Sequence, residues 1–193
     1  MKKGTLLAVL AMAASSSFAV ELVVNGDFES GVAPWVEFSS GGFAIIGDYS
    51  SIGGPPTNTA WLGGYDDATD SITQTISTLS NATGELSFTL YWVNADIAGF
   101  DFLTVSLGGT EVYSRDLGDD EPTDLYGPEV VSVDVSGLLD GSAKDLVFQV
   151  TTDESAGSSA FIDNVSLQAE VVPEPATLAV LGLGLAAMRR RRK

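Results

Sequence analysis

Glu85-Leu86-Ser87-Phe88-Thr89-Leu90-Tyr91-Trp92 is the stretch that decides the fold class of this chain. Its large apolar side chains, Leu86, Phe88, Leu90 and Trp92, alternate with residues that are mostly polar. A period of two places successive side chains on opposite faces of a β-strand. The stretch therefore predicts a strand that buries one face.

The same period of two returns along the chain between clusters of Gly, Asp and Asn. It is found in Leu103-Val105-Leu107, Val131-Val133-Val135 and Leu146-Phe148-Val150. No segment keeps a helical period over three turns. Short alternating strands separated by turn residues are typical of an antiparallel sandwich. We expect an all-β chain of about nine to eleven strands, for which a jelly roll is the natural arrangement.

The N-terminus has the three parts of a secretory signal peptide. Lys2 and Lys3 precede an apolar run over residues 6–14, and Ser17-Phe18-Ala19 supplies small residues where a signal peptidase cleaves. We expect residues 1–19 to be removed before Val20. The alternative, an N-terminal core helix, would need a longer amphipathic pattern.

The C-terminus combines a proline pair, an apolar segment and a basic cluster. Pro173, Glu174 and Pro175 form an extended, accessible tripeptide, because proline excludes a helix or a central strand. The apolar residues 176–188 predict a short hydrophobic helix, shorter than the ~20 residues that normally span a bilayer. We expect a transient membrane stop, and an ordinary single-pass anchor remains the alternative. The cluster that would stay in the cytoplasm is Arg189, Arg190, Arg191, Arg192 and Lys193.

This order of proline pair, apolar segment and arginines resembles the PEP-CTERM sorting signal of Gram-negative bacteria. The resemblance covers residues 173–193 and implies recognition by an exosortase, a membrane enzyme that processes such tails. It also implies export to the cell surface or the extracellular matrix.

Between the two signals, residues 20–172 form one domain with an extreme charge. They hold 25 of the 26 acidic residues of the chain and only two of its nine basic residues, Arg115 and Lys144, so the net charge is −23. Such a surface repels nucleic acid and anionic lipid and attracts divalent cations. We therefore expect no nucleic-acid partner, and membrane contact only through the C-terminal segment.

Cysteine and histidine are absent from the chain. The sequence thus excludes Cys-His and Ser-His-Asp catalysis, and it excludes zinc sites that use imidazole or thiolate. An exported domain without disulfides depends on its core, and a bound metal could add to its stability.

Two motifs resemble the first and last strands of galactose-binding-like jelly rolls, which include families of carbohydrate-binding modules. They are Leu22-Val23-Val24-Asn25-Gly26-Asp27-Phe28-Glu29 with Trp35, and Phe161-Ile162-Asp163-Asn164-Val165-Ser166-Leu167. A middle segment, residues 60–76, is similar to adhesive domains of secreted bacterial proteins. The resemblance implies a jelly-roll fold more firmly than it implies a ligand.

Asp163 falls in the apolar phase of its predicted strand, with Phe161, Val165 and Leu167. An inward carboxylate is costly unless it is paired or bound to metal, and calcium suits carboxylate and carbonyl oxygens. In the jelly rolls that this chain resembles, a structural calcium often joins the first and last strands. The matching ligands would be Asp27 or Glu29 together with Asp163. The alternative is an Asp163 capped by backbone N–H groups or hydroxyls without metal.

Two further acidic segments, residues 118–124 and Asp66-Asp67 with Asp70, are secondary cation candidates. Neither matches the calcium loop of EF-hands, so we interpret both as solvated acidic loops.

The aromatic residues offer a possible platform for stacking against sugar rings. Tyr91 lies on the polar phase of its strand and Tyr65 lies in a glycine-rich loop, so these two are the surface candidates. Trp92 lies on the apolar phase and is expected in the core. For any single aromatic residue, packing in the core remains the default interpretation.

Three function classes remain. The first is a non-catalytic surface or matrix protein associated with exopolysaccharide or biofilm, and this is the class that we expect. The second is a carbohydrate-binding module with a specific glycan ligand. The third is a carboxylate-based glycosidase or lyase, which is disfavoured because no motif indicates a carboxyl group with a raised pKa.

Overall fold

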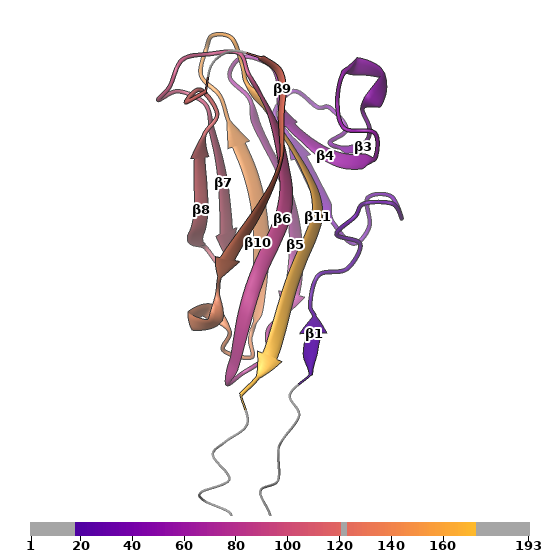
Figure 1. Cartoon of the computed structure of the whole chain (residues 1–193), viewed down its shortest axis with the longest axis vertical. Coiled ribbons are helices and arrows are strands. Elements are labelled where there is room, and N and C mark those ends of the chain that lie inside the picture. Colours follow the sequence, from indigo (N-terminus) through magenta and orange to yellow (C-terminus); the bar gives the residue numbers. More distant parts are fainter. Residues whose placement is uncertain (1–17, 121–122, 173–193) are drawn as a thin grey trace, which may run out of the picture.

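Two antiparallel sheets packed face to face form the protein in the computed structural model, which describes residues 18–120 and 123–172 (Figure 1). The described residues contain the number of strands that the sequence predicts. These are β1 (Ala19–Glu21), β2 (Val36–Ser39), β3 (Ile46–Asp48), β4 (Asn58–Gly63), β5 (Thr69–Ser77), β6 (Ala82–Asn94), β7 (Phe102–Leu107), β8 (Thr110–Asp116), β9 (Thr123–Asp134), β10 (Ala143–Thr151) and β11 (Ser159–Val171). The helical elements are two short 3₁₀ turns, η1 (Ser50–Ile52) and η2 (Ser136–Leu138).

The strand order is that of a jelly roll. One sheet runs β3-β4-β11-β6-β9, with β1 paired to β11, and the other runs β2-β5-β10-β7-β8. The first and last strands therefore lie side by side, and Ala19 pairs with Glu170. The described chain enters and leaves at the same end of the sandwich (Figure 1). The predicted antiparallel jelly roll is confirmed.

The core lies between the sheets and consists of the residues that the alternation assigns to it. Phe88 of β6 and Phe148 of β10 meet edge to face across the sandwich, with ring centroids 5.1 Å apart. Trp35 is buried beside Phe148, with centroids 6.3 Å apart. Trp92 is also buried, as predicted. The facing strands are thus held together by aromatic and aliphatic contact without a disulfide.

A bulge in β11 reverses which side chains face the core. The register with β6 shifts between Asp163 and Ser166, and Asn164 adopts a left-handed conformation with φ of 52°. Ile162 faces the core before the bulge, whereas Val165 and Leu167 face it afterwards. Asp163, opposite Thr89, therefore lies on the outer face of its sheet. The prediction that Asp163 points inward with Val165 is wrong in direction, because the bulge inserts one residue into the alternation.

The motif at residues 22–29 follows β11 closely but is a turn-rich segment and not the strand that the resemblance implied. Leu22 N–H donates to the carbonyl of Leu167 (3.0 Å), and Val165 N–H donates to the carbonyl of Gly26 (2.8 Å). The Asn25 side chain organises the next turn by donating to the carbonyl of Gly31 (2.7 Å). The motif is therefore fixed by its contact with the bulge.

The terminal signals lie almost wholly outside the described residues. Of the predicted signal peptide only Phe18 and Ala19 are described, and the whole of the segment 173–193 lies outside the described residues. Within residues 18–120 and 123–172, no helix is long and apolar enough to cross a membrane.

Gly26 packs too closely on the bulge to accept a side chain. A Cβ atom there would lie 1.8 Å from the carbonyl oxygen of Val165. We expect Gly26→Ala to lower the free energy of unfolding by about 1–3 kcal/mol, because the segment must move away from β11. Gly137→Ala is the matched control, since nothing lies within 4 Å of its Cβ position. Chemical denaturation measures both, and equal stability of the two variants would contradict the close contact.

Candidate functional site

A pocket of about 330 Å³ opens where β4 ends, at the end of the sandwich opposite β1 and the C-terminal end of β11. Aromatic rings form most of its wall. They come from the segment before β3, from the turn before η1, from β4 and from the loop that follows β4. The lining residues are Phe43, Ala44, Tyr49, Trp61, Gly63, Gly64, Tyr65 and Asp70.

Trp61 is the central ring of this pocket. Its neighbours in β4, Ala60 and Leu62, are fully buried in the core, so the alternation turns Trp61 to the outer face of the sheet. There it stacks on Phe161 of β11, with centroids 5.8 Å apart and an interplanar angle of 12°. Tyr49 meets Trp61 edge to face at 5.0 Å. Trp61 is thus held between two aromatic neighbours.

Tyr65 forms a second wall and is fixed by its hydroxyl group. The hydroxyl donates to Oδ1 of Asp70 (2.6 Å) and accepts from the backbone N–H of Gly41 (2.9 Å). Oδ2 of Asp70 accepts from the backbone N–H of Gly63 (3.0 Å). The tyrosine ring also meets Phe43 edge to face at 5.2 Å. Its orientation is therefore set before any ligand arrives.

Asp70 corrects one sequence prediction. The sequence placed Asp70 with Asp66 and Asp67 in a solvated acidic loop. Asp66 and Asp67 are exposed, but Asp70 is 2% exposed and begins the buried phase of β5. Its two oxygens accept hydrogen bonds from Tyr65 and Gly63, which makes burial of the carboxylate possible.

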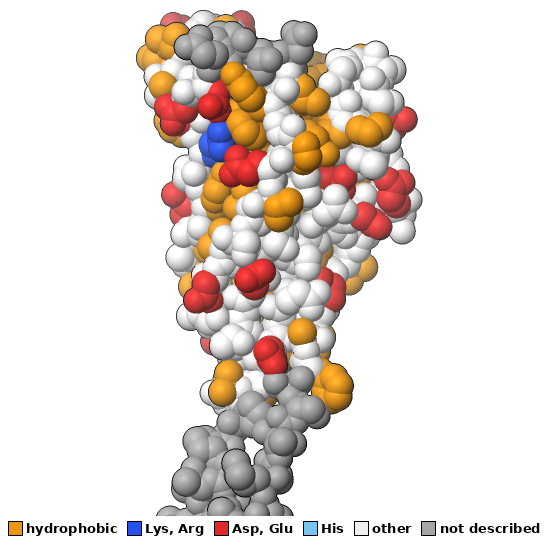
Figure 2. Space-filling model, in the orientation of Figure 1, with side chains coloured by type: hydrophobic (Ala, Val, Ile, Leu, Met, Phe, Trp, Pro, Cys, Tyr) orange, Lys and Arg blue, Asp and Glu red, His pale blue; other side chains and the backbone are white. Residues whose placement is uncertain are grey.

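Tyr91, the other predicted surface aromatic, does not line the pocket but lies on the same face. Cross-strand pairing sets Trp61 opposite Phe161, and Phe161 opposite Tyr91, so the three form a row across the outer face. Figure 2 shows hydrophobic side chains gathered in the upper half of one face of the protein, with acidic side chains around them. From the sequence, Trp61 was one of several aromatic residues that could form a stacking platform but was not selected as a surface candidate, although its place between Ala60 and Leu62 was a usable signal.

The predicted calcium ligands lie on neighbouring segments. Asp163 is 4% exposed and accepts hydrogen bonds from the hydroxyl of Thr57 (2.9 Å) and the N–H of Asn164 (2.7 Å). Burial raises the pKa of Asp163 despite these bonds, and the charges of Glu29 and Asp27 add to the rise. Glu29 itself accepts from the side chain of Asn58 (2.9 Å). Calcium at Asp27, Glu29 and Asp163 stays a prediction.

Arg115 forms an ion pair with one residue of the acidic segment after β8. Its guanidinium contacts Asp120 at 2.7 Å and Glu129 at 2.9 Å, and it lies 3.8 Å from the ring centre of Trp92. Trp92 also donates to Asp120 (3.2 Å). These contacts lie at the side of the sandwich where β8 and β9 are the edge strands of the two sheets.

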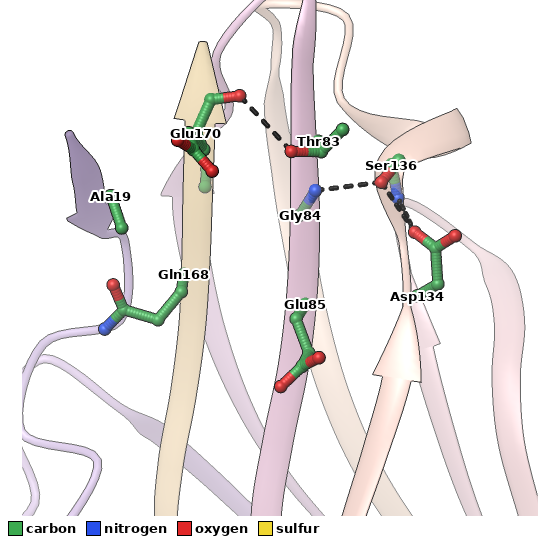
Figure 3. Close-up of a pocket in the computed structure, with 9 residues that line it drawn as sticks. Ala19, Thr83, Gly84, Glu85, Asp134, Ser136, Gln168 and Glu170 are labelled. Carbon is green, nitrogen blue, oxygen red and sulfur yellow. Dashed lines mark hydrogen bonds between the residues drawn. The ribbon is translucent and has the colours of Figure 1, made fainter. Parts of the chain in front are cut away.

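A larger groove of about 580 Å³ lies at the opposite end, near β1 and the end of β11 (Figure 3). Its lining residues are small residues or residues with polar side chains, and no aromatic ring belongs to the described residues that line it. Asp134 accepts from the hydroxyl and N–H of Ser136, which lower the pKa of Asp134. We therefore regard the aromatic pocket as the better candidate site.

Solved structures with the same fold define the class as a β-sandwich like that of carbohydrate-binding modules. The module TmCBM61 in complex with beta-1,4-galactotriose is 16% identical, with a TM-score of 0.52, over 77% of this chain and 97% of that one. The K3 adhesin domain of Lys-gingipain from Porphyromonas gingivalis w83 is 13% identical, with a TM-score of 0.52, over 77% and 98%. A cyclase from Fischerella sp. TAU is 14% identical, with a TM-score of 0.48, over 81% and 100%.

The tail has a specific match. Residues 171–193 match the PEP-CTERM protein-sorting motif, and this range includes Pro173, Glu174, Pro175 and the arginines 189–192. This motif indicates an exported protein that is sorted at the membrane, and it implies processing by an exosortase. No curated protein matches the chain in sequence.

The hydroxyl of Tyr65 gives a direct test of the pocket geometry. Tyr65→Phe keeps the ring but leaves Oδ1 of buried Asp70 without its donor, so we expect a loss of about 1–3 kcal/mol in the free energy of unfolding. Tyr91→Phe, the control, removes a hydroxyl from a half-buried tyrosine of β6 and should have little effect. Chemical denaturation compares the two variants. Unchanged stability of Tyr65→Phe would contradict the proposed anchoring by Asp70.

Proposed function

We propose that this chain is a non-catalytic exported protein that an exosortase sorts to the Gram-negative cell surface or extracellular matrix, where its sandwich contacts exopolysaccharide in a biofilm. The observation that carries the proposal is the pocket of Tyr49, Trp61 and Tyr65 in a chain whose tail matches the PEP-CTERM motif. Aromatic faces with a few fixed polar groups suit the alternating apolar and hydroxyl surfaces of a sugar ring.

The lining of the pocket favours binding over hydrolysis. Glycosidases act with a pair of carboxyl groups that flank the scissile bond. The described lining has a single carboxylate, Asp70, and both of its oxygens accept hydrogen bonds from the protein. Asp70 is thus used to orient Tyr65 and Gly63.

The charge of the domain favours a neutral glycan. The net charge of −23 over residues 20–172 repels polyuronates and sulfated polymers, and Asp70 adds a negative charge in the pocket wall. A neutral polysaccharide escapes this repulsion. The second candidate function, a carbohydrate-binding module with one specific glycan, is favoured by the stacked pair Trp61 and Phe161, which presents a rigid ring.

We also propose calcium at Asp27, Glu29 and Asp163 as a structural staple in place of disulfides. Burial is the main cause that raises the pKa of Asp163, and the charges of Glu29 and Asp27 add to the rise; a bound cation would offset both effects, which supports the proposal. Asp163→Asn should lower the number of bound calcium ions by one. An unchanged number of bound calcium ions, measured by metal analysis, would contradict this calcium site.

Binding to neutral polysaccharide tests the pocket. In affinity electrophoresis through a neutral β-1,4-galactan and through the exopolysaccharide of the native host, we expect Trp61→Ala to weaken binding about tenfold or more, because it removes the stacking surface. Phe38→Ala, an exposed aromatic on β2 of the other sheet, is the control. Retardation by neutral but not by uronic-acid gels is also expected. Equal retardation of both variants would exclude the pocket as the glycan site.

Processing of the tail tests the sorting assignment. The intact mass of the protein recovered outside the native host should end near Val172 or within Pro173–Pro175. In a host that lacks its exosortase, the mass should still include residues 189–193 and the protein should stay with the inner membrane. An unprocessed protein in both hosts would make the tail a plain anchor.

A further inference from the structure

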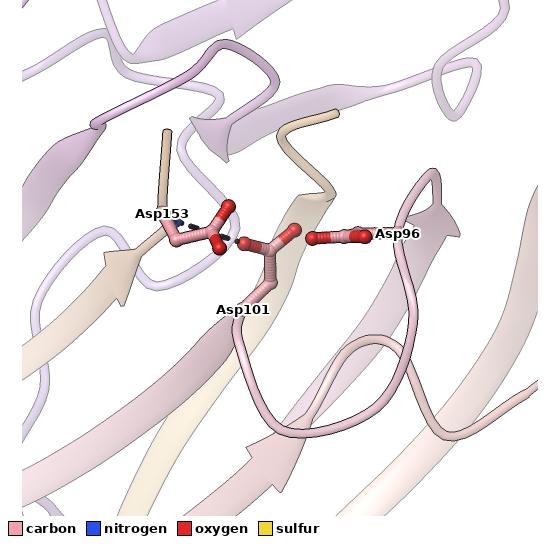
Figure 4. Close-up of side chains that lie close together, drawn as sticks. All are labelled: Asp96, Asp101 and Asp153. Carbon is pink, nitrogen blue, oxygen red and sulfur yellow. Dashed lines mark hydrogen bonds between the residues drawn. The ribbon is translucent and has the colours of Figure 1, made fainter. Parts of the chain in front are cut away.

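Three carboxylates outside the sequence motifs converge at the end of the sandwich opposite β1 and the C-terminal end of β11. Asp96 lies in the loop between β6 and β7, Asp101 directly precedes β7, and Asp153 follows β10. One carboxylate oxygen from each lies within 4.8 Å of the other two. Figure 4 shows the three side chains directed toward one another from separate segments.

Asp101 is the buried member of this acid cluster. It is 0% exposed, and its oxygens accept from the backbone N–H groups of Asp153 (3.2 Å) and Ser158 (2.7 Å). These neutral donors hold the carboxylate in place but leave its charge uncompensated. A fully buried carboxylate beside two others is costly unless a cation is present.

Asp96 provides the independent indication of a ligand. Its Oδ1 accepts from the N–H of Ile97 (2.7 Å), whereas its Oδ2 is buried and has no hydrogen-bond partner. Figure 4 shows this carboxylate pointing at Asp101. A buried carboxylate oxygen that has no donor and faces two other carboxylates is placed as a metal ligand would be.

Among the residues that the structure describes, no basic side chain forms an ion pair with this cluster. Within the described ranges the basic side chains are Arg115 and Lys144. Arg115 is bound to Asp120 and Glu129, and Lys144 to Asp140. Neither forms an ion pair with Asp96, Asp101 or Asp153.

We propose that Asp96, Asp101 and Asp153 bind a calcium ion. The ligands are oxygen atoms only, which selects a hard divalent cation, and calcium completes its shell readily with carbonyl groups and water. Because β6 and β11 belong to one sheet and β7 and β10 to the other, the ion clamps the two sheets together at this end. The site is separate from the motif site, since none of its ligands belongs to residues 22–29 or 161–167.

The test counts calcium on the full chain, purified in detergent and stripped with a chelating resin. Equilibrium dialysis uses calcium on the order of millimolar, the range of extracellular modules. Asp96→Asn should bind one ion fewer than the wild type and should keep the ion that Asp163→Asn loses. Glu154→Gln is the matched control, because this exposed neighbour of Asp153 is outside the cluster and should keep every ion.

The temperature of thermal unfolding gives a second readout. If Asp96 served the fold without binding a metal, the effect of its substitution on this temperature would not depend on calcium. Without calcium, Asp96→Asn should melt at or above the wild-type temperature, because one repulsive charge is gone. With calcium, the wild type should melt above Asp96→Asn. Asp153→Asn repeats the test if Asp96→Asn does not fold. Equal calcium counts in the wild type and the variant, or a temperature difference that calcium does not change, would overturn the site.

Discussion

Three buried carboxylates without a basic partner set the main constraint on this fold. Asp70, Asp101 and Asp163 are each 4% exposed or less, in a domain with two basic residues. Each is held by backbone N–H groups or hydroxyls, because a buried carboxylate must find donors somewhere. Each acid accepts at least one hydrogen bond from a loop residue, namely Tyr65, Ser158 or Thr57, so each helps to fix a segment outside the sheets.

Two of these buried carboxylates fix loops at one end of the sandwich, whereas strand pairing fixes the other end. Asp70 and Asp101 fix the loops after β4 and β10 at one end, where the aromatic pocket and the acid cluster lie. At the other end β1 and β11 pair, and the chain passes into the segment that matches the sorting motif. The pocket therefore lies at the opposite end of the sandwich from β1 and the C-terminal end of β11.

The sequence predicts the strands and the core better than it predicts the sites. Alternation is a local signal, so β6, β7, β9 and β10 and the burial of Phe88 and Phe148 could be predicted. The direction of Asp163 could not, because the bulge at Asn164 shifts the alternation by one residue. Asp70 was misjudged and the acid cluster was missed for a different reason. Their partners come from distant loops, which only the strand order brings together.

The pocket and the acid cluster are linked through one residue, Ser158. The N–H of Ser158 donates to Asp101, and the carbonyl of Ser158 accepts from the N–H of Gly64 (2.9 Å) in the pocket wall. The hydroxyl of Thr152 also donates to the carbonyl of Tyr65 (2.7 Å). The loop after β10 thus contacts the acid cluster on one side and the pocket on the other. A shift of Asp101 would therefore disturb the hydrogen bonds that connect it through Ser158 to Gly64, which are the physical connection between the acid cluster and the pocket wall.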